Sequence, residues 1–453
     1  MRIISSPLIA AAALSLMLGA CGGGGDDDDD DLQEAAPAAA ACPEAVTAIA
    51  SCLAGQDSEG AYYLIAMPNE WNGNLVLHAH GGPSLDAPTP DRSADDLTRW
   101  AVMVEAGYAW AGSTFRQGGV EVSAAAEDTE RLRQIFEEHV ASPRRTILHG
   151  QSWGAGVAAK GAEMFTEEST GSQPYDAVLL TSGVLAGGTR SYDFRLDLRV
   201  VYQYLCNNHP RPNEASYALS IGLPADSSMT RADLAARTAE CLGLDKSADQ
   251  RTAEQQAKVE TIVNVIRVPE SSIQAHLNWG TFHFEDVVQE RTGGASPFGN
   301  IGAQYSGSPD DAALNAGVQR YAADAQAVER FAQDTDPTGR IPVPVLSVKG
   351  TGDPTAFVEL DAYFKTIMQS GGSADRLVQT FTDHAVHSYL SDPTYATLLA
   401  ALLQWVDEGV KPSAAGIAQQ CPAFEGEFGV GCRFLPEYVA PALETRVPAR
   451  ERP

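Results

Sequence analysis

The sequence predicts an α/β protein whose core is a mainly parallel sheet covered by helices on both faces, with a large, mostly helical insertion. Apolar, strand-like segments alternate with amphipathic, helix-like segments, which is the order of elements in a parallel sheet. The chain has 453 residues, which is enough for one large domain with an insertion or for two domains. Its hydrophobic content of 44% and its charged content of 20% are those of a globular protein.

Periodicity gives the expected elements in order along the chain. Helices are expected where apolar residues recur at helical spacing, at residues 95–106 and 124–139, and in a segment that ends near residue 406. The alternation stops from about residue 187 to residue 340, where the sequence predicts a helical, loop-rich insertion. Strands are expected at short apolar runs: 61–66, 75–80, 108–115, 146–149, 176–180, 344–349 and 376–381.

Residues 150–154, Gly-Gln-Ser-Trp-Gly, stand between a predicted strand and a run of small residues that begins a predicted helix. A G-x-S-x-G sequence in that context is typical of a nucleophile elbow, a turn so sharp that the positions two before and two after the serine require glycine. The turn exposes the serine oxygen and directs the next backbone N–H at the reacting carbonyl. The motif therefore predicts that Ser152 is a catalytic nucleophile.

An earlier loop, His-Gly-Gly-Pro at residues 80–83, follows another predicted strand. In serine hydrolases with an elbow, a loop at this position supplies the second donor of the oxyanion hole. Pro83 has no N–H and cannot donate. The predicted donors are therefore the amides of Gly82 and Trp153, with Gly81 in reserve.

These motifs and their order resemble the α/β-hydrolase superfamily, from about residue 42 to residue 412 apart from the insertion. Relatives carry a cap over the active site at this position, so the resemblance implies that residues 187–340 form a cap, or lid. The resemblance implies a triad acid in the turn after the penultimate strand, where Asp353 stands, with Glu359 and Asp361 as the nearest substitutes. It also implies acyl transfer to water with no metal and no organic cofactor.

The triad base is expected after the last predicted strand, where the sequence offers two histidines. His387 is favoured over His384 because it precedes Ser-Tyr-Leu and a terminal helix, similar to the His-x-x-Phe segment of relatives. Val386 stands where those relatives have glycine, so His384 remains the alternative. His78 and His149 lie on predicted core strands and are expected to be packed structural residues.

The N-terminal segment predicts export and a lipid anchor. Residues 1–20 hold an apolar run that is too short to span a membrane and is typical of a signal peptide. Leu-Gly-Ala-Cys at residues 18–21 resembles a bacterial lipobox, which implies acylation of Cys21 and contact with a membrane through the lipid only. The following Gly22 favours the outer membrane, on its periplasmic or cell-surface face. Residues 21–41 are expected to form a flexible tether rich in Gly, Asp and Ala.

Charge and cysteine content narrow the classes of partner and compartment. The net charge of −28 argues against a nucleic-acid partner. No C-x-x-C or matching histidine spacing indicates a metal site. Six cysteines remain after Cys21, an even number that suits an oxidising compartment. Many connectivities are possible, and the simplest joins sequence neighbours: Cys42–Cys52, Cys206–Cys241 and Cys421–Cys432.

The predicted function is hydrolysis of a carboxylic ester, from a small molecule or a polymer, through Ser152, His387 and Asp353. The two Gly-rich motifs also resemble the prolyl aminopeptidase family, although Ser84 replaces the last glycine of its H-G-G-P-G segment. A proline-type aminopeptidase or amidase is therefore an alternative, and a non-catalytic surface binding protein is the third hypothesis. The oligomeric state stays open. The predicted parts are a signal peptide (1–20), a tether (21–41), a hydrolase core (42–186 and 341–412), a cap (187–340) and a C-terminal extension (413–453).

Overall fold

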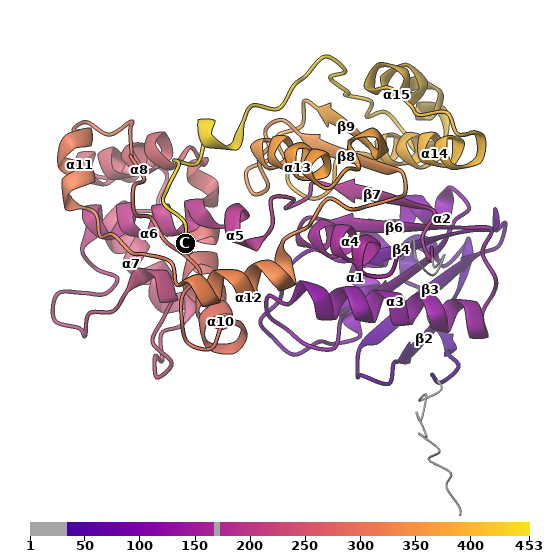
Figure 1. Cartoon of the computed structure of the whole chain (residues 1–453), viewed down its shortest axis with the longest axis horizontal. Coiled ribbons are helices and arrows are strands. Elements are labelled where there is room, and N and C mark those ends of the chain that lie inside the picture. Colours follow the sequence, from indigo (N-terminus) through magenta and orange to yellow (C-terminus); the bar gives the residue numbers. More distant parts are fainter. Residues whose placement is uncertain (1–33, 167–172) are drawn as a thin grey trace, which may run out of the picture. The chain divides into compact units, whose positions relative to one another are not determined.

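The computed structural model describes residues 34–166 and 173–453. Within these residues one sheet has the strand order β1-β2-β3-β5-β4-β6-β7-β8-β9 (Figure 1). The edge strands β1 (Ala38–Ala40), β2 (Ala50–Gln56) and β3 (Tyr62–Pro68) run antiparallel to their neighbours. The remaining strands are parallel to one another: β4 (Asn74–Ala79), β5 (Ala109–Ser113), β6 (Arg145–Gln151), β7 (Ala177–Thr181), β8 (Val345–Gly350) and β9 (Leu377–Thr382).

Helices cover both faces of the sheet because successive side chains of a strand point to opposite sides. On β4, Val76 belongs to an apolar cluster that includes the helices α2 (Ala101–Glu105) and α14 (Asp392–Glu408). Its neighbours Leu75 and Leu77 belong to the opposite cluster, with the helices α3 (Val122–His139), α4 (Trp153–Met164) and α13 (Glu359–Ser370). The predicted fold class, a mainly parallel sheet between helical layers, is confirmed.

Two predictions about the first part of the chain are wrong. Residues 38–40, expected in the flexible tether, form β1, because their backbone pairs with β2 beside the disulfide at Cys42. The helix expected at 95–106 is two helices, α1 (Asp91–Arg99) and α2, because the backbone at Trp100 leaves the helical region with φ −104° and ψ 23°. This break lets the Trp100 ring pack fully buried against the ring of His149, at 4.5 Å between centroids.

The region 187–340 is helical, and its elements gather beside the sheet (Figure 1). Side chains from these helices form an apolar cluster of their own, in which the rings of Phe284 and Phe298 stack at 3.7 Å. The α-helices of the cap are α5 (Gly188–Ser191), α6 (Asp193–Cys206), α7 (Arg231–Leu242), α8 (Ala253–Ile266), α9 (Ile273–Asn278), α10 (Phe284–Asp286), α11 (Asp311–Gly317) and α12 (Ala325–Thr335).

The C-terminal extension connects the two parts of the fold. After α15 (Ala414–Gln420) and α16 (Glu425–Phe428), the chain runs back from the sheet to the cap, as the yellow segment in Figure 1 shows. Leu443 and Val447 join the apolar cluster of the cap, and the guanidinium of Arg450 pairs with Asp197 of α6 at 2.7 Å.

Three disulfides join the cysteines that are neighbours in the sequence: Cys42–Cys52, Cys206–Cys241 and Cys421–Cys432. Because such bonds form and persist in oxidising compartments, they indicate a protein that is exported from the cytoplasm. A helix with the length and apolar character needed to cross a membrane is absent from the described part of the chain. The predicted signal peptide and Cys21 lie outside the described residues.

Candidate active site

Ser152 occupies a sharp turn between β6, which ends at Gln151, and α4, which begins at Trp153. Its backbone has φ 55° and ψ −118°, a conformation that side-chain-bearing residues rarely adopt. The flanking glycines are required by close backbone contacts. A Cβ atom on Gly150 would lie 2.2 Å from the carbonyl oxygen of Gly154, and one on Gly154 would lie 2.1 Å from that of Ala79. The local geometry is therefore that of a nucleophile elbow.

A continuous hydrogen-bonded chain leads from Ser152 to a buried carboxylate. The Ser152 Oγ lies 2.8 Å from His387 Nε2. The other ring nitrogen, His387 Nδ1, lies 2.8 Å from Asp353 Oδ2 and 3.0 Å from Asp353 Oδ1. With its Nδ1–H donating to the carboxylate, the imidazole keeps Nε2 free to accept the serine proton. The three residues that the sequence singled out for the triad are thus brought together.

Asp353 is fixed in the turn after β8 by its own neighbours. Its Oδ1 accepts hydrogen bonds from the amides of Thr355 at 2.8 Å and Ala356 at 2.9 Å. The two possible substitutes have other partners, since Glu359 pairs with Arg446 and Asp361 pairs with the buried Lys349. Neither contacts His387 in the described structure, so Asp353 is the acid that the geometry supports.

His384 is held apart from Ser152. Its Nδ1 bonds to the hydroxyl of Thr382 at 2.9 Å, and its carbonyl accepts from the amide of Gly352 at 3.0 Å. Burial, together with the nearby Arg433, lowers the pKa of this histidine below its usual value. His384 therefore supports the turn that carries the acid, while His387 reaches the nucleophile.

Two cap histidines tie the cap to the loops around the triad. His283 Nε2 donates to the carbonyl of Pro83 at 3.0 Å, and His276 Nε2 donates to the carbonyl of Pro354 at 3.0 Å. Burial lowers the pKa of His276 to about 3 and that of His283 to about 4, so both rings are neutral at pH 7. Neither histidine lies in a motif that could have predicted its place at the site.

The peptide between Gly81 and Gly82 has a fixed orientation. Its carbonyl oxygen accepts hydrogen bonds from Arg92 at 2.6 Å and from His80 Nδ1 at 2.6 Å. In a planar trans peptide the N–H points opposite to the C=O, so these two donors also fix the direction of the Gly82 N–H. The amide of Trp153 is at the first turn of α4, where backbone N–H groups have no partner within the helix. The two predicted oxyanion donors both line the cavity around Ser152.

The hydrogen bond from Arg92 to the Gly81 carbonyl can be tested by mutation. Arg92→Gln is expected to lower kcat by about 10- to 100-fold with a smaller change in KM, because a misdirected Gly82 amide weakens oxyanion binding in the transition state. Steady-state kinetics on a chromogenic ester measures both constants. Arg376→Gln, at an exposed arginine outside the cavity, is the control that should leave both unchanged. An unaltered kcat in Arg92→Gln would contradict this role of the Gly81–Gly82 peptide.

The triad opens into a cavity of about 290 Å³. Its described lining includes Ser152, His387, three arginines and the aromatic rings of Tyr192 and Trp279 from the cap. A second cavity of about 290 Å³ shares Arg92 and Trp153 with it, and exposed carboxylates line that one: Asp86, Asp91 and Asp95. Together they offer space on two sides of Trp153.

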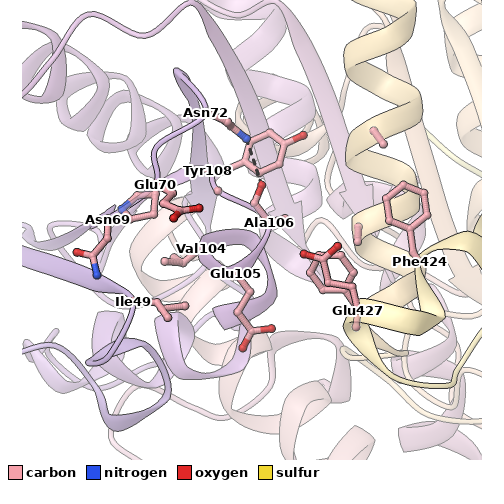
Figure 2. Close-up of a pocket in the computed structure, with 15 residues that line it drawn as sticks. Ile49, Asn69, Glu70, Asn72, Val104, Glu105, Ala106, Tyr108, Phe424 and Glu427 are labelled. Atoms are coloured by element: carbon pink, nitrogen blue, oxygen red, sulfur yellow. Dashed lines mark hydrogen bonds between the residues drawn. The ribbon is translucent and has the colours of Figure 1, made fainter.

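A larger cavity, of about 640 Å³, shares no residue with the one around Ser152. Figure 2 shows Phe424 and Glu427 of the C-terminal extension on one side of it and Ile49, Glu70 and Glu105 on the other. Its lining contains no serine, cysteine or histidine among the described residues. Ser152 and His387 line the smaller cavity instead.

Comparison with known proteins gives limited sequence similarity. No protein-family model matches the chain. An o-phthalyl amidase from Xanthobacter agilis is 31% identical over 121 residues, which is 26% of this chain and 25% of that protein. The chain thus matches only about a quarter of the length of this curated relative.

Several solved hydrolase structures are similar to this one. Feruloyl esterase B from Aspergillus oryzae aligns with a TM-score of 0.44 and 14% identity, over 83% of this chain and 86% of that one. The rice cell wall degrading esterase LipA from Xanthomonas oryzae aligns with a TM-score of 0.37 and 12% identity, over 87% and 98%. A puromycin hydrolase aligns with a TM-score of 0.37 and 13% identity, over 83% and 40%. On its own strand order and its elbow between β6 and α4, this chain has the α/β-hydrolase fold.

Proposed function

We propose that this protein is an exported serine hydrolase that cleaves carboxylic esters through an acyl-enzyme. The observation that carries the proposal is the 2.8 Å contact between Ser152 Oγ and His387 Nε2, with His387 held by Asp353 on its other side. A serine becomes nucleophilic when an oriented base can take its proton during attack. The alternative of a non-catalytic binding protein gives no reason for this arrangement at the tip of a strained turn.

The reaction follows from the positions of these groups. Ser152 Oγ attacks the ester carbonyl while His387 accepts its proton, and the amides of Gly82 and Trp153 bind the resulting oxyanion. His387 then gives the proton to the departing alcohol as the ester C–O bond breaks. Water attacks the acyl-enzyme with His387 as base, which releases the acid and restores Ser152.

The choice between ester and amide rests on the leaving group, which the same His387 would protonate in either case. The curated relative is named an amidase, so amide cleavage is retained as a second candidate. The aminopeptidase form of that candidate requires carboxylates near the nucleophile to bind a substrate ammonium group. The described lining of the Ser152 cavity instead carries arginines and no carboxylate, which argues against the aminopeptidase form.

Covalent labelling followed by a substrate panel tests the proposal. A fluorophosphonate should label the purified protein at one site, and peptide mapping should identify Ser152. The panel compares 4-nitrophenyl esters with 4-nitroanilides, proline 4-nitroanilide included. Turnover of esters only supports the esterase, turnover of proline 4-nitroanilide with inert esters supports the aminopeptidase, and neither label nor turnover supports the binding protein.

We also propose that Cys21 carries the lipid anchor. In a bacterial host, Cys21→Ser is expected to move the protein from the membrane fraction to the soluble fraction and to abolish incorporation of labelled palmitate, because the acylated thiol is lost. Fractionation and autoradiography measure the two effects. Ser6→Ala, a change within the predicted signal peptide, should preserve both properties. Unchanged membrane attachment of Cys21→Ser would contradict the anchor.

A further inference from the structure

The cavity around Ser152 is basic although the protein is strongly acidic. The whole chain has a net charge of −28. The described residues that line this cavity nevertheless include Arg92, Arg99 and Arg195 and no aspartate or glutamate. Arg92 is neutralised by Asp96, at 2.7 Å. Arg99 and Arg195 have no ion pair with a described residue, so the cavity holds positive charge that the protein leaves uncompensated.

Arg195 is the unusual member of this set because it is buried. It comes from α6 of the cap, and only 4% of its surface is exposed. Its guanidinium lies over the ring of Trp279 at 4.3 Å and near those of Phe194 at 4.7 Å and Tyr192 at 5.1 Å. Its Nε is buried without a hydrogen-bond partner. The aromatic rings orient the cation but accept none of its hydrogen bonds in the conventional sense.

Two other buried arginines of this region have acceptors for their guanidinium groups, although Arg199 Nε, like that of Arg195, is buried without a hydrogen-bond partner. Arg450 pairs with Asp197 at 2.7 Å and with Asp193 at 3.5 Å. Arg199 donates to the carbonyl of Leu219. A buried cation without such a partner is costly, and buried charges are normally paired. Arg195 therefore differs from Arg450, which has carboxylate partners, and from Arg199, whose guanidinium donates to a backbone carbonyl.

The groups packed around Arg195 supply no negative charge. His276 and His283 are neutral at pH 7, and the ring of His283 stacks on Trp279 at 4.8 Å between centroids. Burial lowers the pKa of Arg195 to about 10, which leaves it a cation at neutral pH. The missing anion must therefore come from outside the described chain, and the cavity gives it access.

We propose that the natural substrate carries a carboxylate close to the bond that is cleaved, and that Arg195 binds this carboxylate while Ser152 attacks the acyl carbon. This inference rests on the proposed function and specifies its substrate class. The substrates are small esters or amides whose acyl part or leaving group bears a free carboxylate. Arg99, exposed at the same cavity, adds to the attraction of an anion. The cavity volume of about 290 Å³ limits the bound part to a small group.

Matched substrate pairs test the proposal. One pair has acyl groups that differ by carboxylate against methyl, as in the mono-4-nitrophenyl ester of isophthalic acid and 4-nitrophenyl 3-methylbenzoate. A second pair moves the same difference to the leaving group, as in 3-acetoxybenzoate and 3-methylphenyl acetate. In the unaltered protein kcat/KM should favour the carboxylate member of at least one pair by about 10- to 100-fold, the usual value of a hydrogen-bonded charge.

Arg195→Met is expected to bring the ratio of kcat/KM between the two members of that pair close to one, and Arg195→Lys should retain part of the preference. Arg190→Met is the matched control, because Arg190 also lies over an aromatic ring, that of Tyr363 at 5.3 Å, but does not line the cavity. Thermal unfolding checks that each variant is folded. If Arg195→Met does not fold, the unaltered protein still decides the matter, since 3-methylbenzoate should inhibit more strongly than 3-methylbenzamide.

The possible outcomes distinguish a failure of the carboxylate site from a failure of the proposed hydrolase function. Equal kcat/KM within both pairs, with Ser152 labelled and the neutral esters hydrolysed, overturns the carboxylate site and leaves the esterase standing. A preference that persists in Arg195→Met, with that variant folded, also overturns the role of Arg195. Absence of both label and turnover overturns the proposed function, and this inference with it.

Discussion

Replacing Ser152 by alanine is expected to lower kcat by about 10⁴- to 10⁶-fold, because no other hydroxyl that lines the described cavity is hydrogen-bonded to His387. The loss should appear in turnover and not in folding. Alanine has the same Cβ as serine, so the strain of the turn is unchanged, and the only hydrogen bond lost is the one to His387. Ester hydrolysis under saturating substrate and mass spectrometry of fluorophosphonate-treated protein measure the two consequences.

A matched control is available in Ser347→Ala. Ser347 is also a buried serine, on β8, and its hydroxyl has no hydrogen-bond partner in the described structure. It does not line the cavity, so kcat and labelling should stay at the level of the unaltered protein. A Ser152→Ala protein that keeps its activity and its label, with a normal melting temperature, would show that the nucleophile lies elsewhere.

The elbow could be predicted from the sequence because its requirements are local. The close contacts at Gly150 and Gly154 involve backbone within the turn or on the adjoining strand, and only glycine satisfies them. The parallel order of the central strands could also be predicted, since long apolar runs alternated with amphipathic helices. Once the fold is a parallel sheet, its carboxyl ends bring the Ser152, Asp353 and His387 turns to one edge.

The features that could not be predicted from the sequence depend on contacts between segments that are far apart in the chain. β1 and β2 consist largely of small residues and carry no clear alternation, so only the pairing of β1 with β2 and of β2 with β3 defines the sheet edge. Arg92 and Arg195 lie in segments with no motif, and each gains its role from a loop or ring that folding brings to it. An arginine without a partner is visible only when all of its neighbours are known. The ion pairs of Arg450 could not be predicted either, because its acidic partners are more than 250 residues away in the chain.

The choice of base was also left open by the sequence, because two histidines follow β9 within five residues and the usual glycine is replaced by Val386. The structure separates them through their partners. His387 bonds to Ser152 and Asp353, whereas His384 bonds to Thr382 and supports the turn through its backbone. The departure at Val386 is tolerated because that side chain is 47% exposed and needs no close packing.

His387→Ala is therefore expected to lower kcat by about 10⁴- to 10⁶-fold, while His384→Ala should lower it by less than about 10-fold. The first change removes the side chain that, among the described residues, hydrogen-bonds to the Ser152 hydroxyl. The second removes one hydrogen bond to Thr382 but keeps the backbone carbonyl that holds Gly352. Because an absent imidazole can be replaced from solution, added imidazole should restore part of the activity of His387→Ala and have no effect on His384→Ala. The two variants thus act as controls for each other, with melting temperatures measured for both. Loss of turnover in His384→Ala alone, with His387→Ala still active, would assign the base to His384 and contradict the contact between His387 and Ser152.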